Sequence, residues 1–367
     1  MTQLALTHLK ISHFRSHRAS EISCDARPVA IYGPNGAGKT NILEAVSLFS
    51  PGRGIRRASA QDMTRRPEAL GWKLSGILTT SDGTQEIETW SESGAARQVK
   101  INDKTAPQTK LGELCRVIWL IPAMDRLWIE GAEGRRRFLD RTALSFFPDH
   151  AEASLIYEKT MRERNRLLKE QIRDAHWYKA LEDQMAKCAT QLHANRLATL
   201  EQLTDAQRKT STAFPIAELV LQQSEGESPI SEDAFREAFA ESRSRDLIAG
   251  QTLVGPHRSD LTATYIAKDV PASDCSTGEQ KALLISMILA NARALADTLG
   301  TPPILLLDEV AAHLDADRRA ALYDELIDLK AQAWMTGTED HLFDALGDRA
   351  QYLTVSEDAG ISALSKA

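Results

Sequence analysis

The stretch from residue 29 to residue 46 constrains the fold of this chain more than any other. Val29–Tyr32 is a short apolar run, as in buried strands. The next eight residues, 33 to 40, fit the pattern G-x-x-x-x-G-K-[ST], and a helical pattern begins directly after them. A strand, a glycine-rich loop and a helix in this order form the context that a phosphate-binding loop requires. The stretch therefore predicts an α/β fold with a site for a nucleoside triphosphate.

The residue types in this loop match the chemistry of a triphosphate. Glycines let successive backbone N–H groups turn toward an anion, and the helix N-terminus adds positive potential. We expect Lys39 to reach the β- and γ-phosphates and the Thr40 hydroxyl to bind Mg²⁺. The predicted ATP-binding residues of the loop are Gly33, Pro34, Asn35, Gly36, Ala37, Gly38, Lys39 and Thr40.

Composition is that of a globular chain with about two domains. The 367 residues are 43% hydrophobic and 26% charged. Four widely separated cysteines favour reduced thiols in the cytoplasm over a disulfide framework or a zinc site. The first residues lack the layout of a signal peptide, and the apolar stretch 282–296 contains Ser286, Asn291 and Arg293, so no membrane span is expected. A net charge of −7 weakens a DNA-binding interpretation without excluding it, because such a site needs only a local basic surface.

Strand patterns at both ends of the chain flank a charge-rich helical region. Apolar residues spaced along 155–172 and 181–192 predict two helices, which would form a short antiparallel arm and no long coiled coil. We therefore predict a discontinuous head, residues 1–121 and 252–367, interrupted by a helical lobe, residues 122–251. The other predicted elements are hairpins in 3–23 and in 72–101 (with a turn at 81–84), strands at 117–121, 304–307 and 333–336, a loop at 222–231, and helices at 276–297 and 316–331.

Two acids follow the apolar strand at 304–307. A strand that ends in Asp308-Glu309 would place carboxylates at the carboxyl edge of a parallel sheet, beside the phosphate loop. We expect Asp308 to hold Mg²⁺, and Glu309 to accept a proton from the attacking water or to orient it. Apolar runs that end in acids are common. The presence of the phosphate loop at 33–40 in the same chain is what supports a catalytic interpretation of this one.

The segment Ser276-Thr277-Gly278-Glu279-Gln280-Lys281 opens the helix at 276–297 and has two interpretations. Ser276 and Glu279 fit a capping box, which any helix can use to satisfy its first N–H groups. The same exposed N–H groups, with Ser276, could instead face a γ-phosphate. On local grounds the cap is favoured, and the two interpretations are compatible. We expect structural or surface roles for His257 and His341. The segment Thr336-Gly337-Thr338 ends the last clear strand, where a γ-phosphate sensor could sit.

Together these motifs resemble the ATP-binding-cassette heads of the SMC/Rad50 class and, more narrowly, the RecF family. The resemblance covers nearly the whole chain and implies a head with an inserted helical lobe. One departure is Ala123, where the family usually has an acid after the proline, so the glutamine-loop contact is unassigned. The stretches that carry the resemblance are Leu9–Arg15, Gly33–Asn41, Arg135–Asp140, Gly255–Arg258 and Ser276–Lys281.

This resemblance implies an ATP-dependent homodimer that binds DNA. Ser276, Gly278 and Glu279 of one copy would close over the phosphates held by Lys39 of the other, with Asn41 and Asp315 completing the nucleotide site. The dimer would bind duplex beside a single-stranded gap. With RecO and RecR it would promote RecA loading in DNA repair, recombination, replication and the SOS response. A weak, DNA-stimulated ATPase would reset it.

The arginines give the candidate DNA surface. We predict contacts from Arg56, Arg57, Arg65 and Arg66, with Arg53 and Arg135–Arg137 as further candidates. Arg162, Arg164 and Arg166 are expected to form a solvated helix face.

Two other functions use the same fold. If the chain were the energy-coupling subunit of a membrane transporter, we would expect fewer residues between the phosphate loop and the signature segment (here Ser276–Lys281). We would also expect a histidine in place of Thr338. A scaffold head that hydrolyses nothing is disfavoured by Glu309.

Overall fold

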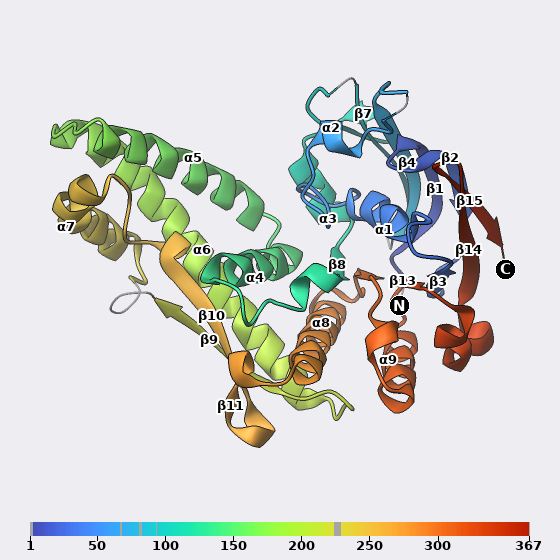
Figure 1. The fold of residues 1–367 in the computed structure, drawn as a ribbon. Coiled ribbons are helices and arrows are strands. Elements are labelled where there is room, and N and C mark those ends of the chain that lie inside the picture. The colour runs from blue at the N-terminus through green and yellow to red at the C-terminus, as the bar shows by residue number, and fades with distance from the viewer. Residues whose placement is uncertain (1–2, 67, 81–82, 93, 224–228, 367) are drawn as a thin grey trace. The chain divides into compact units, whose positions relative to one another are not determined.

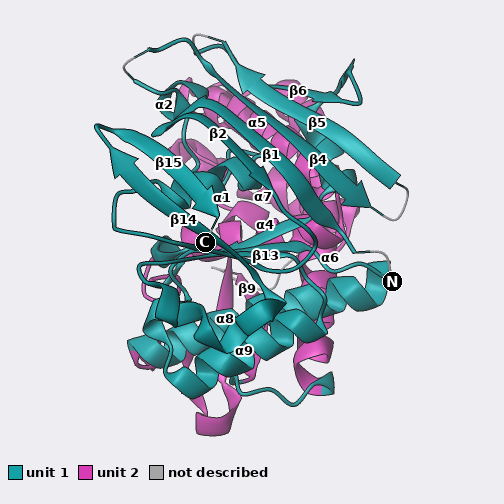
Figure 2. Cartoon of the chain, turned by 90° about the vertical axis from the view of Figure 1, so that its right-hand side faces the viewer, with its two compact units in different colours: residues 1–125, 209–215, 277–367 teal, residues 126–208, 216–276 magenta. Residues whose placement is uncertain are grey.

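The computed structural model describes residues 3–66, 68–80, 83–92, 94–223 and 229–366 (Figure 1). The chain divides into two compact units (Figure 2). Unit 1 contains the residues up to Asp125, Lys209–Pro215 and the residues from Thr277 onward, and unit 2 contains Arg126–Arg208 and Ile216–Ser276. The first unit is discontinuous, as the predicted head is. The division differs from the prediction at residues 252–276, which we expected in the head and which pack in unit 2. It also differs at residues 122–125 and 209–215, which we expected in the lobe and which belong to unit 1.

Unit 1 is built on a six-stranded, mostly parallel sheet. Its three central strands are apolar and almost wholly buried, as strands covered on both faces must be. Only the last strand of the chain runs antiparallel to its neighbour. The predicted strands at 117–121, 304–307 and 333–336 are confirmed within one residue. The order is β15 (Ile361–Lys366), β14 (Gln351–Asp358), β3 (Val29–Tyr32), β13 (Ala333–Gly337), β12 (Ile304–Leu307) and β8 (Val117–Leu120).

A second, antiparallel sheet of unit 1 contains both predicted hairpins. In the first, Phe14 lies opposite His17, so the turn is tight. In the second, the paired strands run from Trp72 opposite Ser91 to Thr80 opposite Gly83. Ser81 and Asp82 of the expected turn lie outside the described residues. The order is β2 (His17–Ser23), β1 (Ala5–Phe14), β4 (Trp72–Thr80), β5 (Gly83–Ser91), β6 (Gln98–Ile101) and β7 (Lys104–Thr105).

The helices of unit 1 cover both faces of the parallel sheet. Ile42, Leu43 and Val46 of the first helix join a core cluster with residues of both sheets. The two C-terminal helices lie on the opposite face (Figures 1 and 2) and confirm the predictions at 276–297 and 316–331. The helices are α1 (Lys39–Ser47), α2 (Ala60–Met63), α3 (Leu111–Leu114), α8 (Thr277–Leu299) and α9 (Ala316–Asp328), with 3₁₀ turns η1 (Gln108–Lys110), η2 (Pro122–Met124), η6 (Ala311–His313) and η7 (Asp340–Arg349).

Helix α8 is the one helix of the described part of the chain that is long and apolar enough to cross a membrane. Within its most apolar 18-residue window, 72% of the residues are buried inside the protein. Leu283, Leu284 and Leu289 are among its fully buried side chains. These features are those of a core helix.

Unit 2 combines the predicted helical arm with a small sheet. Helices α5 (His150–Lys169) and α6 (Ala175–Lys209) confirm the two predicted helices and pack around a cluster that includes Tyr157 and Met185. The remaining elements are α4 (Ala132–Phe146), α7 (Glu232–Ala249), η3 (Pro256–Arg258), η4 (Ile266–Lys268), η5 (Ala272–Asp274) and an antiparallel sheet in the order β11 (Val270–Pro271), β10 (Ser259–Tyr265) and β9 (Ala217–Gln223).

The loop predicted at 222–231 is wrong at its start. Gln222 and Gln223 end β9, where they pair with Asp260 and Ser259 of β10. This pairing joins segments far apart in the chain, and local polarity could not show it. Residues 224–228 of the predicted loop lie outside the described residues.

Arg164 corrects a second expectation, because it is not part of a solvated face. Its side chain is fully buried and donates to Asp246 at 2.7 Å and to Glu182 at 3.1 Å, which ties α5 to α7 and α6. Arg162 and Arg166 are exposed, as predicted. Two residues along a helix correspond to about 200° of rotation, so position 164 faces inward when 162 and 166 face outward.

Candidate nucleotide-binding site

The predicted phosphate loop joins β3 to α1 and curls around its own lysine. Gly33 and Gly38 have φ angles of +149° and +102°. At Gly33 a side chain is excluded, since an added Cβ would lie 2.0 Å from the carbonyl oxygen of Val355. Lys39 is buried, and its Nζ donates to the carbonyl oxygens of Gly33 at 2.7 Å and Pro34 at 2.9 Å. The strand, loop and helix expected from the sequence are present.

Side chains from two hairpins support this loop from behind. Ser362 Oγ donates to the carbonyl oxygen of Ala37 at 2.6 Å, and His17 Nε2 lies 3.1 Å from that of Gly38. Burial lowers the pKa of His17, so the ring is neutral and its Nε2–H is the donor. Asn41, in the first turn of α1, donates to Ser16 Oγ at 2.7 Å. These contacts fix the course of the loop backbone.

Sequence reasoning missed Ser16, His17 and Ser362. The stretch Leu9–Arg15, which precedes Ser16, was noted only because it resembles the RecF family. Ser362 lies 325 residues from its partner Ala37. No local pattern identifies such a partner.

The acids at the end of β12 meet the loop at the carboxyl edge of the sheet. Thr40 Oγ1 lies 2.9 and 3.1 Å from the two carboxylate oxygens of Asp308. Asp308 is buried and also accepts a hydrogen bond from Thr336 of β13 at 2.7 Å. Glu309 follows with a left-handed φ of +54°, and its N–H donates to the same Thr336 hydroxyl at 2.9 Å. The structure thus brings Thr40 and Asp308, the predicted metal-ligating pair, into direct contact.

The electrostatics of Lys39 show where Glu309 acts. Burial lowers the pKa of Lys39, and the negative charges of Glu309 and then Asp308 oppose this shift. The carboxylate of Glu309 is therefore close enough to the loop lysine to favour its charged form. A hydroxyl and a carboxylate are hard oxygen ligands, which suits Mg²⁺ when phosphate oxygens and water complete its shell. The described residues contain no cluster of three or more His, Cys, Asp or Glu side chains that could hold another metal ion.

The signature-like segment is exposed. Ser276, Thr277 and Gly278 are all exposed, Glu279 is half-buried, and α8 begins at Thr277. A Cβ added at Gly278 would meet no atom within 4 Å. Packing of this chain therefore gives no reason for a glycine at this position.

Two further predicted features have local explanations. Asp315 caps α9 by accepting a hydrogen bond from the N–H of Arg318 at 2.8 Å. In the segment after β8, where the glutamine-loop contact was unassigned, Ala123 lies in a 3₁₀ turn and Asp125 pairs with Lys281 of α8 at 3.3 Å. The cap gives Asp315 a role within unit 1, and the pair with Lys281 engages one of the two Asp125 carboxylate oxygens.

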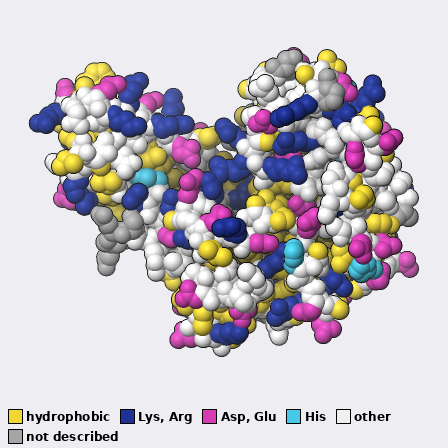
Figure 3. Space-filling model, viewed as in Figure 1, with side chains coloured by type: hydrophobic (Ala, Val, Ile, Leu, Met, Phe, Trp, Pro, Cys, Tyr) yellow, Lys and Arg dark blue, Asp and Glu magenta, His cyan; other side chains and the backbone are white. Residues whose placement is uncertain are grey.

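Three of the four arginines predicted to contact DNA are exposed, namely Arg56, Arg57 and Arg66. Figure 3 shows Lys and Arg side chains gathered over the part of unit 1 that carries α1 and α2. Arg56 is partly neutralised, since it donates to Asn41 Oδ1 at 2.7 Å and to the buried carboxylate of Glu44 at 3.1 Å. Within the described residues neither Arg57 nor Arg66 forms an ion pair, although the charge of Arg66 contributes, after a hydrogen bond from Ser59, to the lowered pKa of Asp62.

Arg65, the fourth predicted DNA contact, is a structural residue. It is 5% exposed, and its Nη1 donates to the carbonyl oxygens of Ser16 at 2.9 Å and Gly360 at 2.8 Å. A guanidinium enclosed in this way joins two hairpins and does not reach a phosphate backbone. Its predicted role is therefore corrected.

Two arginines of the cluster 135–137 are also structural. Arg135 forms a bidentate pair with Asp260 at 2.8 and 2.7 Å, and Arg136 donates to the Ser259 carbonyl oxygen at 2.8 Å. They connect α4 to β10, which immediately follows the Gly255–Arg258 motif, whereas Arg137 is exposed and pairs with Glu133 of its own helix. His257 in that motif is structural too, because its two ring nitrogens contact Tyr157 Oη at 2.8 Å and the Thr252 carbonyl oxygen at 3.0 Å.

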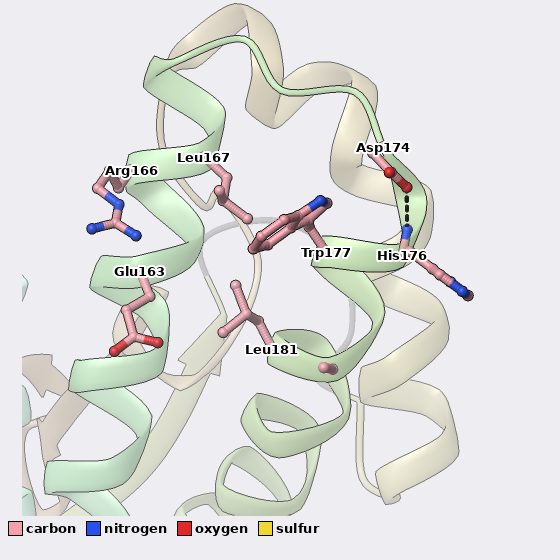
Figure 4. A pocket seen from close by; sticks show the side chains of 8 residues that line it. Glu163, Arg166, Leu167, Asp174, His176, Trp177 and Leu181 are labelled. Carbon is pink, nitrogen blue, oxygen red and sulfur yellow. Dashed lines mark hydrogen bonds between the residues drawn. The ribbon is translucent and has the colours of Figure 1, made fainter.

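A pocket of about 490 Å³ lies in unit 2, between α5 and α6 near the turn that joins them. In Figure 4 the indole of Trp177 points toward Leu167, and Glu163 and Arg166 stand on the facing helix. None of the predicted nucleotide-site residues lines it, and it lacks a glycine loop that could receive phosphates. The pocket is separate from the site described above.

Comparisons with known proteins agree on the family. Residues 5–361 match the family described as the RecF/RecN/SMC N terminal domain. The chain is 45% identical over 366 residues to the DNA replication and repair protein RecF of Rhizobium etli, covering 97% of this chain and 98% of that protein. It is 46% identical over 367 residues to the RecF protein of Mesorhizobium japonicum, covering 96% of each chain.

Solved structures share the fold. The recombination mediator protein RecF-ATP in the RecFOR pathway superposes with a TM-score of 0.86 at 23% identity, covering 99% of this chain and 98% of that one. An Smc head bound to the C-winged helix domain of ScpA gives 0.59 at 15% identity, covering 99% and 97%. The fold and the loop are thus those of an ATP-binding-cassette type ATPase head of the SMC group. Since its whole-length relatives at 45–46% identity are RecF proteins, the chain belongs to the RecF family.

Proposed function

We propose that this chain is an ATP-switched DNA-binding protein of recombinational repair that works in the cytoplasm. The observation that carries the proposal is the contact between Thr40 and Asp308 beside the glycine loop, in a chain of the RecF family. ATP would lie along Gly33–Thr40, and Thr40 with Asp308 would hold Mg²⁺. The metal would neutralise charge that develops on the phosphates.

The residues of the loop edge would divide the work of hydrolysis. Lys39 would exchange the carbonyl oxygens of Gly33 and Pro34 for phosphate oxygens, which are stronger acceptors because they are charged. Glu309 would orient the attacking water or accept its proton. Its position next to a lysine and a metal-ligating acid supports this role.

We infer an ATP-dependent homodimer from the signature segment. A glycine inside a helix costs about 1 kcal/mol relative to alanine, and Gly278 has no steric reason for its identity within this chain. Close approach of a second copy's triphosphate would supply one, with the exposed Ser276 and the first N–H groups of α8 closing the pocket. Asp315, Asn41 and Glu279 remain proposed members of this composite site.

The DNA surface proposed for the dimer lies on Arg56, Arg57 and Arg66. RecF relatives function in DNA replication and repair, and one solved relative belongs to the RecFOR pathway. We therefore propose duplex and gapped DNA as ligands and RecR and RecO as partners, with RecA loading at single-strand gaps as the outcome.

Sedimentation velocity with ATP, Mg²⁺ and gapped duplex tests this proposal. The wild-type chain should dimerise only with ATP and should then bind the duplex. Glu309→Gln should stay dimeric with ATP and hold DNA longer, because the carboxylate that completes hydrolysis is gone. Glu218→Gln, an exposed change on β9, is the control. A Glu309→Gln chain that remains monomeric at saturating ATP would contradict the switch, and a variant identical to wild type would favour a scaffold that hydrolyses nothing.

A further inference from the structure

One hydroxyl group connects the two acids of the candidate site. Thr336 is the second-last residue of β13, the strand beside β12, and is 1% exposed. Its Oγ1 donates to Asp308 Oδ1 at 2.7 Å and accepts the N–H of Glu309 at 2.9 Å. A hydroxyl has one proton to donate and lone pairs to accept, so both bonds can exist at once.

The bond to Glu309 holds a backbone that is otherwise unfavourable. Glu309 has a φ of +54°, a left-handed conformation that side chains other than glycine and asparagine seldom adopt. Such a conformation persists only where the surroundings enforce it, and it occurs often at functional sites. The φ angle also sets the direction of the Cα–Cβ bond, so the bond from Thr336 helps to decide where the Glu309 carboxylate lies.

The bond to Asp308 restrains the second acid in the same way. Asp308 Oδ1 receives both Thr40 of the phosphate loop and Thr336. Thr40 is the last residue of the loop and Thr336 lies in β13, so the carboxylate is held from two sides. Its rotation is thereby limited before any ligand binds.

We propose that Thr336 is a positioning residue for ATP hydrolysis, which fixes Glu309 and Asp308 relative to the phosphate loop without contacting the nucleotide. This inference rests on the proposed ATPase function. The sequence placed a possible γ-phosphate sensor in the segment Thr336-Gly337-Thr338, and a positioning role for the buried Thr336 is a different one. Valine at position 336 would keep the shape of the side chain but neither hydrogen bond.

The test compares Thr336→Val, Thr336→Ser and wild type. Three quantities are measured: equilibrium ATP affinity, ATP-dependent sedimentation, and the single-turnover hydrolysis rate at saturating ATP with gapped duplex. We expect Thr336→Val to retain ATP affinity and dimer formation while hydrolysis falls about 10- to 100-fold, as for a small displacement of a catalytic group. Thr336→Ser, which keeps the hydroxyl, should restore most of the rate. Thr199→Val, which removes a buried hydroxyl on α6, controls for the general effect of the substitution.

Several outcomes separate this inference from the function beneath it. Wild-type hydrolysis by Thr336→Val overturns the positioning role, and so does a serine variant as slow as the valine variant. Equal losses of ATP affinity and rate, with a lowered melting temperature, also overturn it, because they indicate a purely structural residue. If the wild-type chain itself does not hydrolyse ATP, the proposed ATPase function is wrong, and the positioning role inferred from it is wrong as well.

Discussion

Two buried arginines of unit 2 and the loop lysine of unit 1 have different kinds of partners. In unit 2, Arg164 bonds to two carboxylates, and Arg196 donates to both oxygens of Asp140 at 2.7 and 2.9 Å. In unit 1, Lys39 bonds instead to two neutral carbonyl oxygens of its own loop. A cation already paired with carboxylates has little to gain from a phosphate, whereas one held by carbonyls can exchange them for stronger acceptors. The chemistry of the partner therefore distinguishes Lys39 from Arg164 and Arg196, whereas the carbonyl partners of structural Arg65 show that a ligand-binding cation must also lie in a loop that can receive phosphates.

The largest effect should come from Arg164→Met. Removing the guanidinium leaves Glu182 and Asp246 buried with a charge unpaired or only partly paired, which typically costs about 3–5 kcal/mol. Urea unfolding should show that loss for unit 2, while ATP affinity of the folded chain stays unchanged. Arg166→Met, on the exposed side of the same helix, should shift stability by less than about 0.5 kcal/mol. Equal stabilities for the two variants would remove the distinction drawn above.

A pH profile should show a second structural group in unit 2. Burial lowers the pKa of His257 to about 4, whereas the unfolded chain protonates near 6.5. The unfolded state thus binds more protons between these values, so this stabilisation is complete above pH 6.5 and is lost as pH falls toward 4. The difference amounts to at most about 3 kcal/mol. Stability measured from pH 7 to pH 4.5 should fall less steeply in His257→Gln than in wild type, and the exposed His341→Gln should match wild type.

Lys39→Met should affect ligand binding and spare the fold. Hydrogen bonds to charged groups contribute about 1.5–3 kcal/mol, so ATP affinity should fall about 10- to 100-fold. The free energy of unfolding should change by less than about 1 kcal/mol, because the lost partners are carbonyl oxygens at the edge of the loop. Calorimetric titration measures the ATP affinity, and Lys187→Met, which replaces an exposed lysine of α6, is the control. A variant that unfolds but binds ATP normally would reverse the comparison.

The smallest effect concerns the exposed arginines of unit 1. Each phosphate that a cation neutralises adds about 0.9 to the slope of log affinity against log salt. Arg56→Ala with Arg57→Ala should therefore lower the slope, with Arg57 contributing more, since Arg56 shares its charge with Glu44. Arg137→Ala, whose partner is Glu133, should leave the slope unchanged. Identical slopes in all variants would exclude this loop from the DNA surface.

The parts of the fold that could be predicted depend on neighbours within a few residues. The glycine loop, its flanking strand and helix, and the Asp308-Glu309 pair at a strand end all follow from local periodicity and turn chemistry. Their meeting was predictable too, because parallel strands bring their carboxyl ends to one edge of a sheet.

The parts that could not be predicted involve partners far apart in the chain. Arg164 lies 82 residues from Asp246, and Arg65 lies 295 residues from Gly360. An arginine is usually exposed, so only a distant carboxylate or carbonyl group reveals that it is buried. Residues 252–276 were assigned to the head for the same reason, since the strand that pairs with β10 is β9 of unit 2.

The hydrogen bond from Ser362 to Ala37 has a consequence for how this protein is made. The glycine turn emerges early from the ribosome, but the hydroxyl that braces it is synthesised 325 residues later. The turn can therefore acquire this brace only after Ser362 has been added to the chain.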